Sequence, residues 1–228
     1  MMDELHASLR ESPVAALADL ATRFPGKVTF TTSLGEEDQA ITHLIASHDL
    51  PIRIVTLDTG RLFPESYDLL SRTCAKYKVD IEVFTPETED VQDYVNTHGI
   101  NAFYTSVDLR KGCCGVRKIE PLRRSLVGAQ VWITGLRAAQ SDNRAALPRL
   151  EEDALTGLIK FHPLLAWDDA QLRGYLEEHN VPVNPLHKQG FISIGCAPCT
   201  RAVQQGEHPR SGRWWWEQSS KECGLHQH

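Results

Sequence analysis

Four of the six cysteines in this 228-residue chain occur in two short motifs. Cys113 and Cys114 form a tandem pair in KGCCGVRK, and Cys196 and Cys199 form a C-x-x-C motif in GCAPCTR. Four thiols from two segments suit a site in which a metal is bound by four thiolates. Because glycine permits unusual backbone conformations, we expect the flanking glycines to form a loop that aims both adjacent thiols inward.

Three kinds of site fit these four thiols. Structural zinc usually takes two spaced C-x-x-C motifs, and adjacent ligands are unusual for it. A redox-active C-x-x-C motif would leave the tandem pair unexplained. An iron–sulfur cluster accepts thiolates at varied spacings, and its larger core accommodates neighbouring ligands more easily. The thiol spacing therefore favours a cluster and leaves zinc as the alternative, because ligand spacing fixes the metal only loosely.

The other two cysteines stand alone. Cys74 follows Leu70 by four residues in a predicted amphipathic helix, so we expect it to be a core thiol. Cys223 lies in the terminal segment KECGLHQH, five residues from the end of the sequence. A thiol near a chain end is open to oxidation. Taken alone, that segment is typical of an incidental surface cysteine.

Basic residues gather in the same parts of the chain. The segment LRKGCCGVRKIEPLRR carries many Lys and Arg residues against a single Glu, and EHPRSGRWWWEQSSKEC mixes three basic with three acidic residues. In a protein of net charge −6, two local basic segments predict a site for a small anion. The same negative charge argues against a nucleic-acid partner.

Composition is that of an ordinary globular protein, with 41% hydrophobic and 24% charged residues. The apolar runs fall short of the ~18 residues that a membrane span needs, so we expect no membrane association. The first residues mix acidic and basic side chains and show no signal-peptide pattern. We therefore expect a cytoplasmic protein with reduced cysteines.

Strand and helix patterns alternate along the chain. We predict strands near residues 27–32, 52–58, 80–84, 130–135 and 158–165. We predict helices beginning at Ser12-Pro13 and near residues 36–48, 64–77, 86–99, 117–126 and 167–180, with Pro121 interrupting the fifth and Asp168 capping the last. This alternation predicts an α/β fold, with a parallel twisted sheet that carries helices on both faces.

The regular pattern fades near Thr200. We therefore predict an α/β nucleotide-binding domain over residues 1–200 and a mobile C-terminal tail over residues 201–228. In such folds, ligands bind at the carboxyl ends of strands. Three predicted strands end in suggestive loops, with the sequences TTSLGEED, TLDTGRLFPE and ITGLRAAQSDNR. The first is a poor cradle for polyphosphate, since three acids in a row repel it.

Four of these motifs together resemble the assimilatory adenylyl-sulfate reductases, which belong to the PAPS/APS reductase family. They are CCGVRKIEPL, GCAPCTR, R-x-x-RWWW and the terminal ECGLH, and the match covers nearly the whole chain. The resemblance implies an adenine-nucleotide α-hydrolase-like fold. It also implies that Cys113, Cys114, Cys196 and Cys199 bind a 4Fe–4S cluster. Because the branch of the family that uses 3′-phosphorylated substrate commonly lacks this quartet, its presence favours adenosine 5′-phosphosulfate (APS).

The resemblance also assigns roles to further residues. Cys223 matches the catalytic nucleophile, which would attack the sulfur of APS, release AMP and become an S-sulfocysteine. Thioredoxin would then release sulfite from the adduct. The residues implied to contact the phosphosulfate are Lys118, Arg210, Arg213 and His226, with Arg144 as a further anion contact. The residues implied to contact adenosine are Ser33, Leu57, Gly135 and Arg137.

Two rival interpretations remain open at this point. One is a reductase of the 3′-phosphorylated nucleotide, or of both nucleotides. The other is a zinc-stabilised nucleotide-binding module without catalysis, in which Cys223 has no role. The sequence also leaves the oligomeric state open, a homo-oligomer included. Three adjacent tryptophans, residues 214–216, cannot all face one side, so we expect at least one to be exposed or at an interface.

Overall fold

A single sheet of six strands has the order β3-β2-β1-β4-β6-β5. The strands are β1 (Val28–Thr32), β2 (Arg53–Leu57), β3 (Ile81–Phe84), β4 (Val131–Ile133), β5 (Leu150–Glu152) and β6 (Ile159–Phe161). β1 pairs in parallel with β2 and β4, and β4 pairs in parallel with β6. β5, which the sequence analysis did not predict, is an antiparallel edge strand on β6. The predicted α/β class is confirmed.

The computed structural model describes residue 5 and residues 12–140, 144–208 and 210–217. The described chain forms two compact units. The first contains the described residues up to Thr56 together with Asp68–Glu82 and Gly128–Asn184, and the second contains Leu57–Tyr67, Val83–Val127 and the described residues from Pro185 onward. A domain boundary at residue 200 stays a prediction.

A row of apolar side chains crosses the middle of the sheet. Phe30 on β1 is in register with Ile54 on β2 and with Ile133 on β4, and Ile133 is in register with Phe161 on β6. All four side chains are buried in the main hydrophobic cluster of the first unit. Parallel strands with continuous apolar runs are typical of sheets covered by helices.

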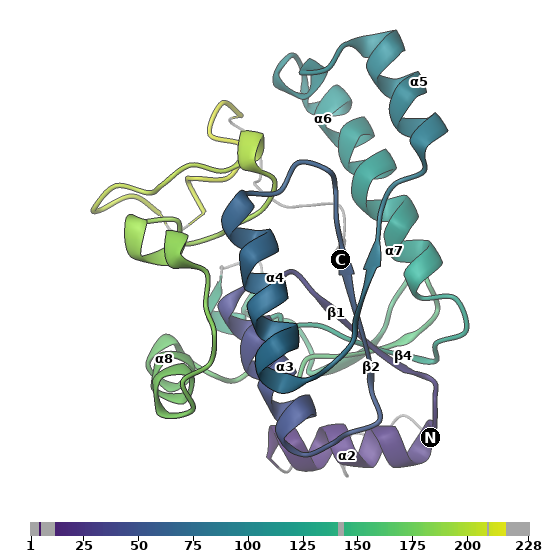
Figure 1. Cartoon of the computed structure of the whole chain (residues 1–228), viewed down its shortest axis with the longest axis vertical. Coiled ribbons are helices and arrows are strands. Elements are labelled where there is room, and N and C mark those ends of the chain that lie inside the picture. Colours follow the sequence, from purple (N-terminus) through teal and green to yellow (C-terminus); the bar gives the residue numbers. More distant parts are fainter. Residues whose placement is uncertain (1–4, 6–11, 141–143, 209, 218–228) are drawn as a thin grey trace. The chain divides into compact units, whose positions relative to one another are not determined.

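Helices complete the first unit (Figure 1). α2 (Pro13–Arg23) begins at the predicted cap, Ser12, whose Oγ accepts a hydrogen bond from the backbone N–H of Ala15. α3 (Glu36–Ser47) packs against α2, against β1 and against α8 (Asp169–Glu178). α8 begins at the predicted cap, Asp168, which forms a capping box with Gln171. α4 (Pro64–Tyr77) begins at the predicted proline, and its residues from Asp68 onward belong to the first unit.

The second unit is mostly helical. α5 (Thr88–His98) lies beside α6 (Val107–Cys114), which continues into a π-helical turn at Gly115–Ile119 and then into α7 (Glu120–Ser125) (Figure 1). The helix predicted over residues 117–126 changes its type just before Pro121, because the π-helical turn ends at Ile119 and α7 begins at Glu120. The proline lies in the first turn of α7, a position that tolerates its missing N–H. Short 3₁₀ turns follow at Pro185–Gln189 and Ala197–Cys199.

The order of the strands creates a switch point in the first unit. From β1 the chain builds β2 and β3 on one side, whereas β4, β6 and β5 lie on the other side of β1. In open α/β sheets, ligands bind at the carboxyl ends of the strands where the order reverses. The loops that follow β1 and β4 contain Ser33 and Gly135, and they therefore lie at the expected position for a ligand. None of the described helices is both long and apolar enough to cross a membrane.

Candidate active site

The loop after β1 is held by one buried carboxylate. Asp38 lies in the first turn of α3, and its Oδ2 accepts hydrogen bonds from the backbone N–H and the hydroxyl of Ser33, both at 2.6 Å. Leu34 between them adopts a positive φ of 62°. The hydroxyl of Thr32 accepts a hydrogen bond from the Leu34 N–H. The loop geometry is thus fixed before any ligand binds.

The loop after β4 approaches the same carboxylate. A Cβ atom added to Gly135 would lie 2.0 Å from Oδ1 of Asp38, a distance that no carbon–oxygen contact tolerates. Only glycine allows the two loops to meet so closely. The structure therefore brings together two of the residues assigned to adenosine, Ser33 and Gly135, on either side of Asp38. Leu57 ends β2.

Burial changes the acidity of Asp38. Loss of water around the carboxyl group raises its pKa from 3.8 to about 6, although the two hydrogen bonds from Ser33 act in the opposite direction. The native protein therefore holds this proton up to about pH 6, whereas the unfolded chain releases it near pH 3.8. Because the folded state binds more protons in this window, the free energy of unfolding falls as the pH rises through it.

We expect Asp38→Asn to remove this pH dependence. Between pH 4 and pH 7.5, the difference in unfolding free energy should shift in favour of the variant by about 2.5 kcal/mol, most of the free energy that corresponds to the pKa shift. Denaturant melts of both proteins across this range measure it. Ser33→Ala is the matched control: it removes one hydrogen bond that lowers the pKa, so the wild-type transition should remain and move to higher pH. A difference that stays constant with pH would contradict the assignment.

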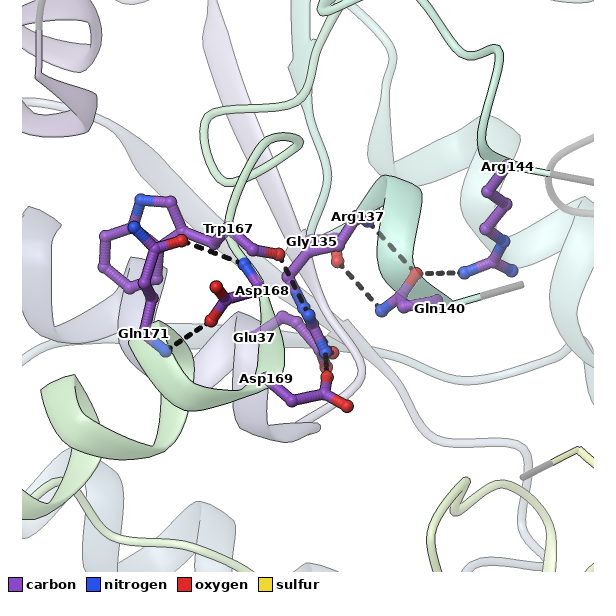
Figure 2. A network of polar contacts seen from close by, with 9 residues as sticks. All are labelled: Glu37, Gly135, Arg137, Gln140, Arg144, Trp167, Asp168, Asp169 and Gln171. Atoms are coloured by element: carbon purple, nitrogen blue, oxygen red, sulfur yellow. Dashed lines mark hydrogen bonds and ion pairs between the residues drawn. The ribbon is translucent and has the colours of Figure 1, made fainter. Parts of the chain in front are cut away.

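Arg137, which is also assigned to adenosine, forms ion pairs with two acidic side chains of the first unit. Its Nη2 lies 2.8 Å from Oε1 of Glu37 and 2.8 Å from Oδ1 of Asp169, and its Nη1 donates to the carbonyl of Trp167 (Figure 2). The guanidinium is buried. It therefore ties the loop after β4 to the first turns of α3 and α8. A direct contact of Arg137 with adenosine stays a prediction.

The tandem cysteines lie in the second unit, and their local structure differs from the expectation. Cys113 and Cys114 are the last residues of α6 and are followed by the π-helical turn, so they are not in a loop. Gly112 and Gly115 have no positive φ. Gly112 instead leaves room for the ring of Tyr94, which would lie 3.3 Å from an added Cβ. The glycines permit close helix packing, and π-helical turns are frequent at functional sites.

All four motif cysteines line one cavity in the second unit. The cavity encloses about 380 Å³, including the space open to solvent. Five basic side chains share its wall: Arg61, Arg110, Arg117, Lys118 and Arg213. Cys196 and Cys199 are buried beside Phe103 and Trp214, with Cys113 packed against them. The five described cysteines are free thiols.

Burial and charge act in opposite directions on these thiols. Burial and, to a smaller extent, a nearby Cys196 thiolate raise the pKa of Cys199 to about 12, although Lys118 and Arg213 act in the opposite direction. Burial also raises the pKa of Cys113, which Arg117 lowers. Thiolates in this cavity therefore need a positive partner beyond the side chains, and a metal ion or cluster is such a partner.

Thr59 and Arg117 are site residues that the sequence analysis did not identify. The hydroxyl of Thr59 lies 3.2 Å from Sγ of Cys196, and its carbonyl accepts a hydrogen bond of 2.7 Å from Arg117. Thr59 belongs to the TLDTG loop at the end of β2, and Arg117 belongs to the basic segment around the tandem pair. Both segments were singled out, but nothing in their spacing distinguishes these two residues from their neighbours.

Arg213 has an unusual environment for a basic residue. It is 7% exposed, its guanidinium lies over the ring of Trp214 at 4.7 Å, and it donates weakly to Ser193 at 3.4 Å. Among the described residues it has no acidic partner, and its Nε has no hydrogen-bond partner. A buried cation without a carboxylate suits an anionic ligand. Arg210 accepts, through its carbonyl, a hydrogen bond from the Arg213 N–H.

A buried ion pair fixes the last described residue. Arg110 on α6 and Glu217 form a bidentate pair with two contacts of 2.9 Å, and both side chains are almost fully buried. The Arg110 guanidinium also lies over the ring of Trp214 at 4.5 Å.

The remaining predictions concern the tryptophan run and the two single cysteines. Trp215 is 40% exposed, which confirms the expectation that at least one of the three tryptophans is exposed. Cys74 is half-buried against the core of the first unit. Cys223 and His226 lie outside the described residues.

The residues of the cavity fit a thiolate-bound cofactor in their chemistry. Four thiols converge on one space, a hydroxyl contacts one of them, and cations surround them. In the part of the chain that the structure describes, no group of three or more Cys, His, Asp or Glu side chains is arranged to hold a metal ion. The 4Fe–4S cluster therefore stays a proposal.

The sheet order and the switch point define a class: an α/β protein with an adenine-nucleotide α-hydrolase-like fold. Residues 27–202 match the model of the phosphoadenosine phosphosulfate reductase domain. The chain belongs to this family.

Named relatives and a solved structure agree with the assignment. The chain is 51% identical to the adenosine 5′-phosphosulfate reductase of Agrobacterium fabrum, over 97% of this chain and 86% of that protein. It is 49% identical to the protein of the same name from Allochromatium vinosum, over 95% and 85%. A phosphoadenylyl-sulfate reductase from Candida auris, crystallised with phosphate, superposes with a TM-score of 0.74 at 30% identity, covering 89% of this chain and 96% of that one.

A more distant structure shows the fold alone. The FMN adenylyltransferase of Candida glabrata aligns with a TM-score of 0.58 at 15% identity, over 94% of this chain and 73% of that chain. This likeness supports the predicted adenine-nucleotide α-hydrolase-like architecture. It carries no information on the reaction.

Proposed function

We propose that the protein reduces adenosine 5′-phosphosulfate to sulfite and AMP in sulfate assimilation. The observation that carries the proposal is the cavity in which all four motif cysteines share a wall with Lys118 and Arg213. The substrate follows from the relatives named adenosine 5′-phosphosulfate reductase, which are about half identical to this chain over nearly its full length.

The reaction follows from the chemistry of the substrate. The Cys223 thiolate attacks the sulfur of APS, so that an S–S bond forms and the bond between sulfur and the bridging phosphate oxygen breaks. AMP leaves with the negative charge of that oxygen, and Lys118, Arg210, Arg213 and His226 are proposed to stabilise it. Adenosine is proposed to bind through Ser33, Leu57, Gly135 and Arg137.

A dithiol completes the cycle. One thiolate of reduced thioredoxin attacks the sulfur of Cys223 in the S-sulfocysteine, and sulfite leaves with the electron pair of the S–S bond. The second thiol of thioredoxin then closes its disulfide and restores Cys223. The two electrons thus come from thioredoxin. We place this reaction in the cytoplasm, where such dithiols are kept reduced.

A 4Fe–4S cluster is proposed as the resident cofactor, with Cys113, Cys114, Cys196 and Cys199 as ligands. The thiol-only donor set and the cations around it support this proposal. When bound, the cluster would supply electrostatic tuning of the anion site. Lys118 is the residue through which this tuning would act, because it lies four residues after Cys114 and its charge acts on both Cys113 and Cys199.

The test is sulfite release from each nucleotide with reduced thioredoxin, using protein purified without air. We expect turnover of APS and little turnover of the 3′-phosphorylated nucleotide. Efficient use of the 3′-phosphorylated nucleotide would favour the alternative reductase. A colourless protein that contains zinc and releases no sulfite would favour the non-catalytic module.

Loss of a cation that is proposed to contact the phosphosulfate should weaken APS binding. We expect Lys118→Ala, Arg210→Ala and Arg213→Ala each to lower kcat/KM, because each loses a charge-assisted contact worth roughly 1.5–3 kcal/mol, which corresponds to about 10- to 150-fold. Steady-state sulfite assays measure the loss. Lys111→Ala is the matched control, since Lys111 is exposed on the same helix as the tandem cysteines and does not line the cavity. Losses below about threefold for all three variants would move the phosphosulfate site elsewhere.

A further inference from the structure

Gly195, the residue before the C-x-x-C motif, lies against the guanidinium of Arg213 in the second unit. A Cβ atom added to Gly195 would lie 2.5 Å from Nη2, 2.7 Å from Cζ and 2.9 Å from Nη1 of Arg213. Because non-bonded heavy atoms pack best at about 3.5–4.0 Å, a methyl group and this guanidinium cannot both occupy the space. The position of the Arg213 side chain therefore depends on a glycine at position 195.

Backbone contacts hold these two residues beside each other. The Gly195 N–H donates to the Thr200 hydroxyl at 3.2 Å, and Thr200 forms an isolated antiparallel β-bridge with Arg213. The N–H of Trp214, the next residue, donates to the carbonyl of Cys199 at 3.2 Å. A shift of the backbone would break these contacts. An added methyl group should therefore displace the guanidinium, which is the end of a flexible side chain, and leave the backbone in place.

Space rather than strong polar contacts determines where this guanidinium lies. It lies over the Trp214 ring at 4.7 Å, and its Nη1 donates to Oγ of Ser193 at 3.4 Å, a longer distance than in an ordinary hydrogen bond. In the described part of the chain, no carboxylate pairs with it. A ring face and one weak hydrogen bond fix a cation less firmly than an ion pair does, so the groups packed around Arg213 decide its position. Arg144 in the first unit differs, because Oε1 of Gln140 accepts a hydrogen bond from its Nη1 (Figure 2), and its contact with the anion stays a prediction.

We propose that Gly195 is a positioning residue, whose missing side chain keeps the Arg213 guanidinium at the wall of the cysteine cavity, where it binds the phosphosulfate group of the nucleotide. The inference rests on the proposed function and extends it to a residue that carries no reactive group and acts only through Arg213. Because Gly195 directly precedes Cys196, the C-x-x-C segment has two proposed tasks. Its thiols are ligands of the cofactor, and its backbone leaves room for a cation that binds the substrate.

Binding of AMP and of adenosine separates this role from a general disturbance of the site. Gly195→Ala should weaken AMP binding by at least about tenfold, the effect of one lost contact to a charged group. Adenosine binding should stay unchanged, because adenosine has no phosphate. The iron content should also stay unchanged, because Cys196 and Cys199 keep their thiols. Calorimetric titration of anaerobically purified protein measures both affinities.

Three results with this variant would contradict the proposal. The first is an equal loss of affinity for AMP and for adenosine. The second is a loss of iron that matches the loss of AMP binding. The third is a variant that fails to fold, as judged by its melting temperature, since the proposal requires the guanidinium rather than the backbone to move.

The matched control is the same substitution in a protein that lacks this guanidinium. In the Arg213→Ala background, Gly195→Ala has no guanidinium to displace, so it should cost little further AMP affinity. Losses that multiply fully would overturn the proposal, as would an unchanged AMP affinity in either single variant. APS turnover by the wild type tests the proposed reduction separately, so a failure of that function is distinct from a failure of this inference.

Discussion

Cys223→Ser is expected to abolish sulfite release while the protein still folds, retains its cofactor and binds APS. The physical reason is that the proposed role of Cys223 is confined to the attacking sulfur, without metal binding or core packing. A serine hydroxyl is not appreciably ionised near neutral pH, whereas a thiolate is readily formed and strongly nucleophilic. No other residue can replace an attacking thiolate, so the loss should be complete within the limit of detection.

Trapping of the intermediate provides the measurement. Wild-type enzyme given APS without reductant should accumulate a sulfo adduct on the peptide that contains ECGLH, detectable by mass spectrometry, and reduced thioredoxin should discharge it with release of sulfite. Cys223→Ser should show no adduct and should bind AMP as the wild type does. An adduct on Cys74, or sulfite production by the serine variant, would reject Cys223 as the nucleophile.

The second large effect is expected at the cysteine cavity. Serine at position 113, 114, 196 or 199 should remove a thiolate ligand and abolish turnover, together with the visible absorbance, iron and acid-labile sulfide of the purified protein. Cys196 and Cys199 are also buried, so serine there places a hydroxyl among Phe103 and Trp214 at a further cost in stability. Cys113 and Cys114 are half-buried and give the cleaner test.

Cys74→Ser is the control for the quartet. Cys74 packs against the core of the first unit, so its serine variant should keep its iron content and activity and lose only some stability. A serine variant of the quartet with full iron content and full activity would remove that cysteine from the ligand set. Zinc in place of iron in anaerobically purified wild type would refute the cluster for the whole set.

Regular elements with a clear hydrophobic period were predictable. β1, β2 and α3 lie within a residue or two of their predicted bounds, and α8 starts at the predicted cap. β5 was missed because LEE has no strand period of its own, and its position depends on pairing with β6. α6 was missed because glycines and adjacent cysteines are weak helix formers, and tertiary packing against Tyr94 overrides their propensity.

The candidate site could be predicted only where residue type carries the chemistry. Thiols and clustered basic residues can be recognised by type, so the four cysteines and the basic segment around the tandem pair were singled out from the sequence, whereas Lys118 itself was assigned through the family resemblance. Asp38 and Thr59 have ordinary residue types at ordinary positions. Their importance arises from contacts with segments far away in the sequence, such as the approach of Gly135 to Asp38 and of Thr59 to Cys196.

The ion pair between Arg110 and Glu217 fixes the position of Glu217, the residue from which the last part of the chain continues. Breaking such a buried pair costs about 3–5 kcal/mol, so Glu217 is firmly attached to α6, the helix that carries Cys113 and Cys114. Cys223 is the sixth residue after Glu217, and six residues span at most about 20 Å. If Cys223 is the nucleophile, as proposed, this radius gives its thiol an effective concentration in the millimolar range or above, whatever the concentration of the enzyme.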